Sequence, residues 1–389
     1  MKRFLALVTL FMLVCTSASA LTYNGGNGLP VILAVGGSFV YARDNQGKLH
    51  IWGDNQFGQL GTSSVKQSYT TREFASKNTE IDLTKLKDIV PANDYSFLWM
   101  EEDKLFGVGN NSYLPLAAKG WKQTTHLKVE LPENTVDIKT GFGHVLALTA
   151  SGEVYAWGRN SCGQVGNGKF KHQITPYKLP LKNIVQIVGG GQFSLALDKD
   201  GVLWGWGDNE YNTLMPEKKR NQSTPVQIDY GDIDIASIEA CGFSVVLLDT
   251  KGTLWTWGRN HMQQLGYDTK RETVKEPRSV PLPLPVTYVA AYSSQTYAIL
   301  TDGSLWSWGN NSYGQLGQGF RSSASQGVLP GKAYDKDVVM VMGGSLFAIA
   351  MTKDGTLLCA GINKYSQLGD GTSKSRYAMS PNGIDLILP

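Results

Sequence analysis

The sequence repeats the stretch Leu305-Trp306-Ser307-Trp308-Gly309-Asn310-Asn311-Ser312-Tyr313-Gly314-Gln315-Leu316-Gly317 seven times in varied form. A Gly and the Asn two positions after it occur in every copy, at spacings of 49 to 56 residues. A period near 50 residues with short strands is typical of propellers. The sequence therefore predicts an all-β fold, a seven-bladed β-propeller of four-stranded blades. The repeat residues, with Trp where a copy has it, are Trp52, Gly53 and Asn55; Gly109 and Asn111; Trp157, Gly158 and Asn160; Trp206, Gly207 and Asn209; Trp257, Gly258 and Asn260; Trp308, Gly309 and Asn311; Gly361 and Asn363.

The fourth copy shows the four strands of a blade most clearly. Apolar runs over 184–188, 193–197 and 202–206 are separated by glycine-containing turns. A fourth run at 224–228 contains Pro225, which a central strand would not tolerate, so it is expected at the outer edge. Four short strands in about 50 residues make one blade.

Aromatic residues two positions apart on the third strand are expected to share a face and fill the wedge between blades. Tyr155 and Trp157 are one such pair, and Trp204 and Trp206 are another. The second and last copies lack the Trp, which predicts looser seams beside those blades. A stacking platform for bases or sugars is the alternative reading of these aromatics.

The Gly of Gly-x-Asn is expected to turn the chain at positive φ, with the Asn side chain bonding nearby main chain. The Leu of the following Gly-Gln-Leu-Gly is expected to pack back into the blade. Strands are predicted at both ends of the ring, at 31–35 and 384–388. The N- and C-terminal strands would close the ring, either in one blade or in two abutting blades.

Residues 1–20 are predicted to form a secretory signal, and residues 21–389 the propeller domain. A basic start at Lys2-Arg3, an apolar run and Ala18-Ser19-Ala20 indicate export to the periplasm or the medium. An uncleaved membrane anchor is the weaker alternative, because the apolar run is short. The formal net charge of +3 drops by two after cleavage. We therefore expect no nucleic-acid partner and, after cleavage, no membrane partner. A monomer is also expected.

The remaining polar residues do not form a catalytic or metal-binding motif. The mature cysteines, Cys162, Cys241 and Cys359, lie in different repeats and are expected to be unpaired packing residues. The five histidines are scattered, and His144 occupies a repeat position that suggests a structural role. No catalytic residue, metal or cofactor is predicted. An enzyme with a site assembled from distant loops stays open as an alternative.

The repeat resembles that of the regulator of chromosome condensation family. Trp-Gly-x-Asn-x-x-Gly-Gln-Leu-Gly is nearly complete at 52–61 and 308–317, and Gly-x-x-His-x-x-Ala-Leu is present at 141–148. The resemblance covers about residues 28–389 and implies a seven-bladed ring used for binding. It implies divergent functions: founding members are exchange factors for the GTPase Ran on chromatin. One secreted bacterial member inhibits β-lactamases, and others activate Ran in host cells.

Two functions follow as expectations. The first is an exported protein-binding scaffold, with another protein as partner, that uses the loops differing between copies. The second is guanine-nucleotide exchange on a Ran-like small GTPase, which needs a binding surface and no catalytic motif. Aromatic and basic loop residues are the candidate anchors: Tyr69, Arg72, Phe74, Phe170, Lys218, Lys219, Arg220, Tyr267, Arg271, Phe320 and Arg321.

Overall fold

The computed structural model describes residues 21–24, 28–62, 67–73, 81–101, 104–214, 221–269 and 271–388, with the backbone alone for 67–73. The predicted secretory signal at 1–20 lies outside these ranges. Within them, no helix has both the length and the apolar character needed to cross a membrane.

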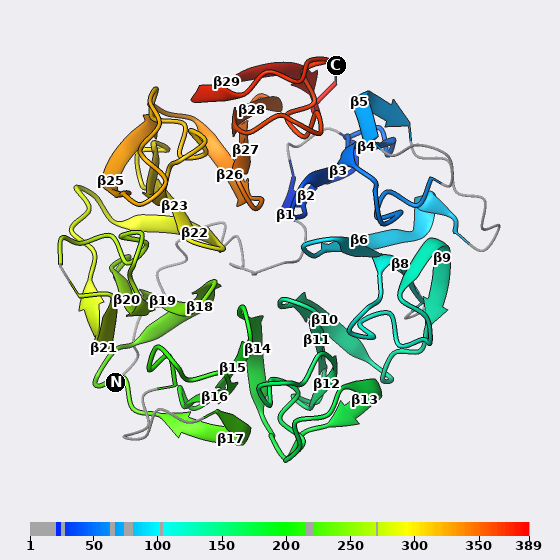
Figure 1. Ribbon diagram of the computed structural model, residues 1–389. Helices are drawn as coiled ribbons and strands as arrows, with labels where there is room; N and C mark the ends of the chain where they lie inside the picture. Colours follow the sequence, from blue (N-terminus) through cyan, green and yellow to red (C-terminus); the bar gives the residue numbers. More distant parts are fainter. Residues whose placement is uncertain are drawn as a thin grey trace, which may run out of the picture.

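Seven antiparallel sheets surround a central opening, each formed from consecutive strands (Figure 1). This arrangement confirms the predicted seven-bladed all-β propeller. We number the blades 1 to 7 along the chain and call the four strands common to each blade a, b, c and d, from the axis outward. The Gly-x-Asn turn of each repeat lies at the end of strand c.

The strands and one short helix have the following bounds. Blade 1 contains β1 (Leu21–Tyr23), β2 (Val31–Val35), β3 (Phe39–Arg43), β4 (Leu49–Asp54) and β5 (Gln67–Glu73), and the 3-10 helix η1 (Leu83–Lys85) leads to blade 2. Blade 2 contains β6 (Leu86–Pro91), β7 (Tyr95–Met100), β8 (Leu105–Asn110) and β9 (Lys122–Val129). Blade 3 contains β10 (Thr135–Thr140), β11 (His144–Thr149), β12 (Val154–Gly158) and β13 (Gln173–Lys178).

The other four blades repeat the same order. Blade 4 contains β14 (Ile184–Gly189), β15 (Phe193–Asp198), β16 (Leu203–Gly207) and β17 (Gln222–Ile228). Blade 5 contains β18 (Ile235–Cys241), β19 (Ser244–Asp249), β20 (Leu254–Arg259) and β21 (Thr273–Ser279). Blade 6 contains β22 (Val286–Tyr292), β23 (Gln295–Leu300), β24 (Leu305–Asn310) and β25 (Gly327–Tyr334). Blade 7 contains β26 (Val338–Gly343), β27 (Phe347–Thr352), β28 (Thr356–Gly361) and β29 (Arg376–Asp385).

Blade 1 differs from the predicted four-stranded form because it has a fifth strand. β1 pairs with β2 on the side nearest the axis. The ring closes between two abutting blades, since β1 belongs to blade 1 and β29 to blade 7 (Figure 1). The predicted strand at 384–388 is wrong beyond Asp385: β29 ends there, and the residues after it bond to the b–c turn of blade 1. The amide and carbonyl of Leu388 both bond the Asn45 side chain, each at 2.9 Å.

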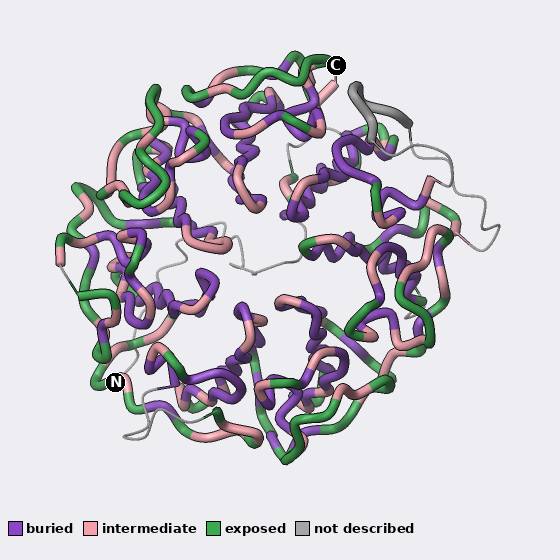
Figure 2. Tube along the Cα trace, viewed as in Figure 1, coloured by how far each residue is buried: buried purple, intermediate pink, exposed green. Residues whose placement is uncertain are grey.

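Burial is greatest in the inner strands and falls toward the outer strands (Figure 2). β2 and β3 are buried throughout, whereas β13 and β17 are mostly exposed or half-buried. The five repeat tryptophans are among the largest fully buried side chains. The leucines of the Gly-Gln-Leu segments, Leu60, Leu316 and Leu368, are buried as predicted.

Each repeat Trp donates a hydrogen bond across the seam to the preceding blade. Trp206 Nε1 donates to the carbonyl of Gln164 at 2.8 Å, and Trp308 Nε1 to that of Gln264 at 3.0 Å. Trp52 Nε1 does the same to Gln367 at 3.0 Å, which joins blade 1 to blade 7. The Trp therefore supplies apolar packing and also satisfies a buried carbonyl.

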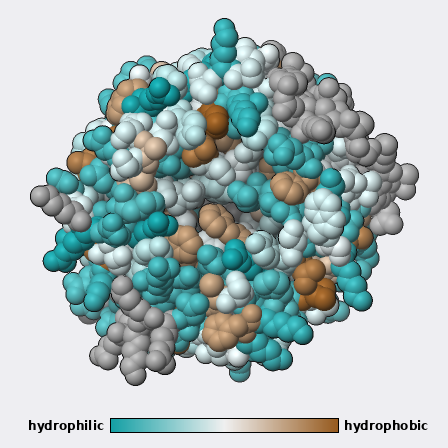
Figure 3. Space-filling model, viewed as in Figure 1, coloured by the Kyte–Doolittle hydropathy of each residue, from teal (hydrophilic) through white to brown (hydrophobic). Residues whose placement is uncertain are grey.

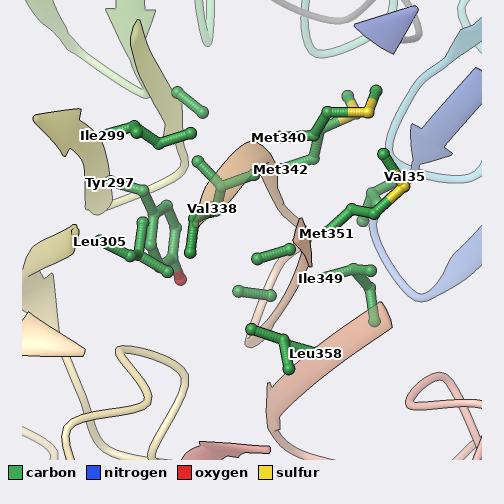
Figure 4. Close-up of a cluster of buried hydrophobic side chains, with 14 of the residues drawn as sticks. Val35, Tyr297, Ile299, Leu305, Val338, Met340, Met342, Ile349, Met351 and Leu358 are labelled. Atoms are coloured by element: carbon green, nitrogen blue, oxygen red, sulfur yellow. The ribbon is translucent and has the colours of Figure 1, made fainter. Parts of the chain in front are cut away.

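At the two seams without Trp, a tyrosine bonds the equivalent carbonyl from within its own blade. Tyr297 of blade 6 donates its hydroxyl to the carbonyl of Gln315 at 2.9 Å, and Tyr41 of blade 1 does so to Gln59 at 2.9 Å. Both tyrosines lie on strand b of the blade that precedes a blade lacking Trp. Figure 4 shows Tyr297 among the apolar side chains between β23 and β26. The tyrosine hydroxyls thus satisfy the buried carbonyls at these seams, and the looser seams stay a prediction.

The Gly-x-Asn turn has the predicted geometry in all seven copies. Gly309 has φ 104°, and a Cβ there would lie 2.2 Å from the carbonyl oxygen of Ser294, so another residue would clash. Asn311 Oδ1 accepts from the amide of Leu316 at 3.0 Å, and its Nδ2 donates to the carbonyl of Phe320 at 2.9 Å. The Oδ1 contact recurs at every repeat Asn.

Candidate functional site

The loops that vary most between copies emerge on one face of the ring. Strands a and c run toward this face in every blade, so it carries the a–b turns and the c–d connections. We call it the c–d face. The repeat Asn fixes the base of each c–d connection, and the remainder is free to vary in sequence. One face of the ring is mainly hydrophilic, with separate hydrophobic patches that include some near the central opening (Figure 3).

Between blades 2 and 3, the c–d face has a cluster of stacked side chains. The Arg159 guanidinium lies 4.7 Å from the centre of the Tyr113 ring, and the His172 ring meets Tyr113 edge-on at 5.7 Å. Tyr113 is still 40% exposed. A ring held on two sides loses little freedom when another molecule binds it, so Tyr113 is a preorganised contact point.

A pocket of about 230 Å³ opens beside this cluster. Its walls include Tyr113, Phe142 and Arg159, and Asp94 lies at one side. Asn110 Nδ2 donates to Asp94 Oδ2 at 2.6 Å. Burial raises the pKa of the Asp94 carboxyl above its ordinary value, and the Asn110 bond acts against that rise. The pocket is large enough for one side chain of a partner.

The seam between blades 4 and 5 repeats the arrangement. The Arg259 guanidinium lies 4.8 Å from the ring centre of Tyr211 and 5.9 Å from that of Phe243. Tyr211 follows its repeat Asn by two residues, as Tyr113 does, and Arg259 precedes its repeat Asn, as Arg159 does. The same two repeat positions thus build both clusters.

Between blades 6 and 7 the cluster is more open. Tyr313 is 43% exposed and Tyr377 is 40% exposed, with the Arg321 guanidinium 5.8 Å from the Tyr377 ring centre. These residues line an open hollow of about 410 Å³ together with Lys364 and two serines. Ile362 takes the place that Arg159 and Arg259 have in the other seams.

Side chains from several blades narrow the central opening at this face. Phe142 of blade 3 and Tyr292 of blade 6 approach with ring centres 6.3 Å apart. Asn93 Oδ1 accepts from the Ser345 hydroxyl at 3.1 Å and from the Tyr292 hydroxyl at 3.5 Å. Burial raises the pKa of the Tyr292 hydroxyl well above its usual range. The c–d face is thus continuous across the axis.

A sequence-family model described as the RCC1-like domain matches residues 128–387, and a second, the regulator of chromosome condensation (RCC1) repeat, matches residues 31–59. The chain belongs to the RCC1-like domain family. The structure is therefore that of an RCC1-like propeller.

Relatives of this propeller include long proteins and proteins of similar size. It is 30% identical over 250 residues to the E3 ubiquitin-protein ligase HERC2 of Homo sapiens, covering 62% of this chain and 4% of HERC2. It is 26% identical over 340 residues to the ultraviolet-B receptor UVR8 of Arabidopsis thaliana, covering 84% of this chain and 75% of UVR8. The chain thus spans only a small part of HERC2.

Among solved structures, the propeller is similar to Prp20p of Saccharomyces cerevisiae. The TM-score is 0.75 with 21% identity, covering 86% of this chain and 85% of Prp20p. That structure was reported with the binding properties of Prp20p to Gsp1p and histones. At this identity the likeness shows the fold alone.

The RCC1-like propeller brings some of the predicted contact residues onto the c–d face. Phe170, Phe320, Arg271 and Arg321 all lie in c–d connections and are exposed. Tyr267 is half-buried and donates its hydroxyl to the carbonyl of Thr256 at 3.1 Å, so it also packs against its own blade. Phe74, Lys218, Lys219 and Arg220 lie outside the described residues, as do the side chains of Tyr69 and Arg72, whose backbone is in β5.

Sequence reasoning missed the Tyr–Arg clusters. The signal that could have found them is positional: Tyr113, Tyr211 and Tyr313 each follow the repeat Asn by two residues. Arg159 and Arg259 fill the variable place within Gly-x-Asn. Since the repeat brings one blade against the next, these two places face one another across a seam.

In this RCC1-like propeller, burial shifts the pKa values of a histidine and two cysteines toward their uncharged forms. His144 is fully buried, its Nε2 lies 2.9 Å from the Ser194 hydroxyl, and burial lowers its pKa to about 3. Cys241 and Cys359 are buried free thiols, and Cys162 is a half-buried one. Burial raises the pKa of the Cys241 and Cys359 thiols to about 12, which disfavours the reactive thiolate. Within the described ranges, no group of three His, Cys, Asp or Glu side chains could hold a metal ion.

Proposed function

We propose that this RCC1-like propeller is an exported, monomeric and non-catalytic protein that holds a partner protein against its c–d face. The observation that carries the proposal is the recurrence of Tyr–cation clusters on one face, at the seams of blades 2–3, 4–5 and 6–7. Fold similarity alone would not name an activity.

The chemistry of these clusters suits protein recognition. Tyrosine and arginine are enriched among the residues that dominate binding energy at protein interfaces. Each Tyr presents a large apolar ring with a polar tip, and the stacked guanidinium keeps donors free for a partner. The blades hold these groups on a rigid ring, which lowers the entropic cost of binding.

Export is part of the proposal. The basic, apolar and small-residue pattern of residues 1–20 supports it. β1 begins at Leu21, directly after the expected cleavage site, so a cleaved chain keeps every described strand. Mass spectrometry of protein recovered from the periplasm or medium should find Leu21 at the N-terminus. Protein found only inside the cell, with Met1 retained or only the initiator Met removed, would contradict export.

A photo-crosslinking comparison tests the binding face. Benzoylphenylalanine replaces Phe170 or Phe320 in c–d connections, and Leu284 on the opposite face in a control chain; all three side chains are at least 40% exposed. Crosslinks to one partner protein are expected from positions 170 and 320 and not from 284. Equal or stronger crosslinking from position 284 would assign binding to the opposite face.

Exchange activity on a Ran-like small GTPase, acting in a host cell, is the second candidate. Its support is the fold similarity to Prp20p, a protein that binds Gsp1p. The test measures release of fluorescent GDP from Ran with the propeller in the micromolar range. Acceleration that is lost in the Tyr113→Ala/Arg159→Ala variant would support exchange through the c–d face. An unchanged release rate would remove this candidate and leave the binding proposal intact.

A further inference from the structure

The c–d connections of blades 2 and 3 are charged with one sign. The connection at 111–121 contains Lys119, and that at 159–172 contains Arg159, Lys169 and Lys171, with no Asp or Glu in either range. The three lysines are exposed. This local excess of positive charge is not evident from the net charge of the whole chain, which is low.

Several acidic residues of the same blades lie at the opposite end, whereas Asp94 lies in the a–b turn of blade 2 on the c–d face. Glu130 and Glu133 lie in the d–a connection between β9 and β10, and Glu153 lies in the b–c turn of blade 3. These acids have basic partners of their own: Lys128 Nζ lies 3.1 Å from Glu130, and Lys178 Nζ lies 2.5 Å from Glu153. At the opposite face acidic and basic side chains are therefore paired, whereas the two c–d connections carry cations without Asp or Glu.

The cations of these two c–d connections lack such partners. Among the described residues, Lys119, Arg159, Lys169 and Lys171 have no carboxylate oxygen within 4.0 Å. Arg159 bonds through Nε to the Ser161 hydroxyl at 3.2 Å and stacks on Tyr113, which leaves the rest of its guanidinium edge for another acceptor.

Large exposed aromatics stand among these cations. Trp121 is 63% exposed and Phe170 is 53% exposed, and both lie in the same two connections as the cations. With Tyr113 and its adjoining pocket they provide apolar anchors. Anchors surrounded by charges of one sign favour a partner with opposite charge around apolar side chains.

We propose that blades 2 and 3 of the c–d face bind an acidic protein segment with interspersed aromatic residues. Carboxylates pair with Lys119, Arg159, Lys169 and Lys171, and an apolar side chain enters the pocket beside Tyr113. Asp94 is the one acidic residue lining that pocket, and its hydrogen bond from Asn110 occupies one of its oxygens. This inference rests on the proposed protein-binding function and names the chemistry of its partner.

A defined peptide tests the chemistry. A fluorescein-labelled peptide of alternating Glu and Phe, a twin with Gln in place of Glu, labelled oligothymidine, and phosphatidylcholine–phosphatidylglycerol vesicles are titrated with the mature chain. The Glu peptide should bind at least about tenfold more tightly than its Gln twin, with the preference declining as salt rises. It should also bind more tightly than the DNA or the vesicles.

Two variants with the same charge change assign the surface. K119E/K169E/K171E alters the c–d face, and K182E/K199E/K251E alters exposed lysines on the opposite face. The first should abolish the Glu preference, and the second should keep it. Equal effects of the two variants would overturn the inference, as would preferential binding of oligothymidine or vesicles, or dimers that pair the c–d face with the opposite face of a second copy.

The natural partner gives an independent readout. A carbodiimide couples lysine amines directly to carboxylates without a spacer. In the complex found by photo-crosslinking, Lys119, Lys169 or Lys171 should become joined to Asp or Glu of the partner. A complex without any such bond would refute the acidic-partner inference alone. Failure to form a complex through the c–d face would refute the proposed function itself.

Discussion

Single side chains satisfy the buried carbonyls at the seams between neighbouring blades. Where a blade carries the repeat Trp, its indole donates to a buried carbonyl of the preceding blade. Where the Trp is missing, a tyrosine hydroxyl in the preceding blade takes over. The replacement follows from the cost of leaving a buried carbonyl without a donor.

The Tyr297→Phe variant removes the donor to Gln315 and should lower the free energy of unfolding by about 1–2 kcal/mol. The Tyr41→Phe variant should cost less, because the Gln59 carbonyl also accepts from the Ser96 hydroxyl at 3.0 Å. The Gln315 carbonyl has no such second donor from blade 7, because Ala348 stands at the position equivalent to Ser96. Urea denaturation of both variants checks the order, and an equal or reversed cost would contradict it.

His144 should make the fold sensitive to acid. Its folded pKa of about 3 lies below the ordinary value of 6.5, so its contribution is complete above pH 6.5 and is lost as pH falls toward 3. At pH 5 the cost is about 2 kcal/mol relative to pH 7.5. The raised pKa of Asp88, about 7, works in the opposite direction, since its stabilisation is complete below pH 4 and is lost through pH 7.

Phe stands at the place of His144 in blades 1, 4 and 7, as Phe39, Phe193 and Phe347. The His144→Phe variant should therefore fold and lose less stability between pH 7.5 and pH 5 than the parent chain. Urea midpoints at the two pH values measure this difference. Identical losses in the two proteins would show that protonation of His144 does not contribute to the loss of stability in acid.

At the scale of elements, the sequence pattern located most of the strands but did not reveal the side-chain clusters on the surface. Alternating apolar runs and turn glycines identified β14 to β17 to within a few residues, because burial imposes a strict period on strands. β1 was missed because its three residues are too few to show the alternation of apolar and polar side chains that marks a strand. The Tyr113–Arg159 pair was missed because two blades contribute to it, and its contact depends on how the blades pack.

The c–d connections depend on their repeat Asn. The Asn311→Ala variant removes the bonds to the Leu316 amide and the Phe320 carbonyl, which should cost about 1–3 kcal/mol. The increase in backbone mobility should be greatest in residues 312–326, the part of the c–d connection that contains Phe320 and Arg321. Limited proteolysis should cut this connection faster than in the parent chain. The Asn310→Ala variant is the control, since Asn310 Oδ1 bonds only Ser312 in the next turn; equal cutting in both variants would contradict the claim.

At the scale of the whole molecule, ring closure rests on the segment after β29. Leu386 is fully buried, and its carbonyl accepts from the amide of Asn45 at 2.9 Å. The Leu386→Ala variant should cost about 2–5 kcal/mol and act on blades 1 and 7 together. Hydrogen exchange should rise first in β2 and β26, on either side of the closing seam. A rise confined to β29 would show that the segment stabilises only its own blade.

The near-neutral net charge gave no sign of the cationic surface on blades 2 and 3, because two connections that are separate in the sequence form it only after folding. That cationic surface and the Tyr–Arg clusters make the c–d face the centre of the functional account. Hydrogen exchange of the propeller, free and bound to its captured partner, tests this most directly. The account predicts protection in residues 111–121 and 159–172 and unchanged exchange in 229–234 on the opposite face. Protection of 229–234 without protection of the two c–d connections would contradict it.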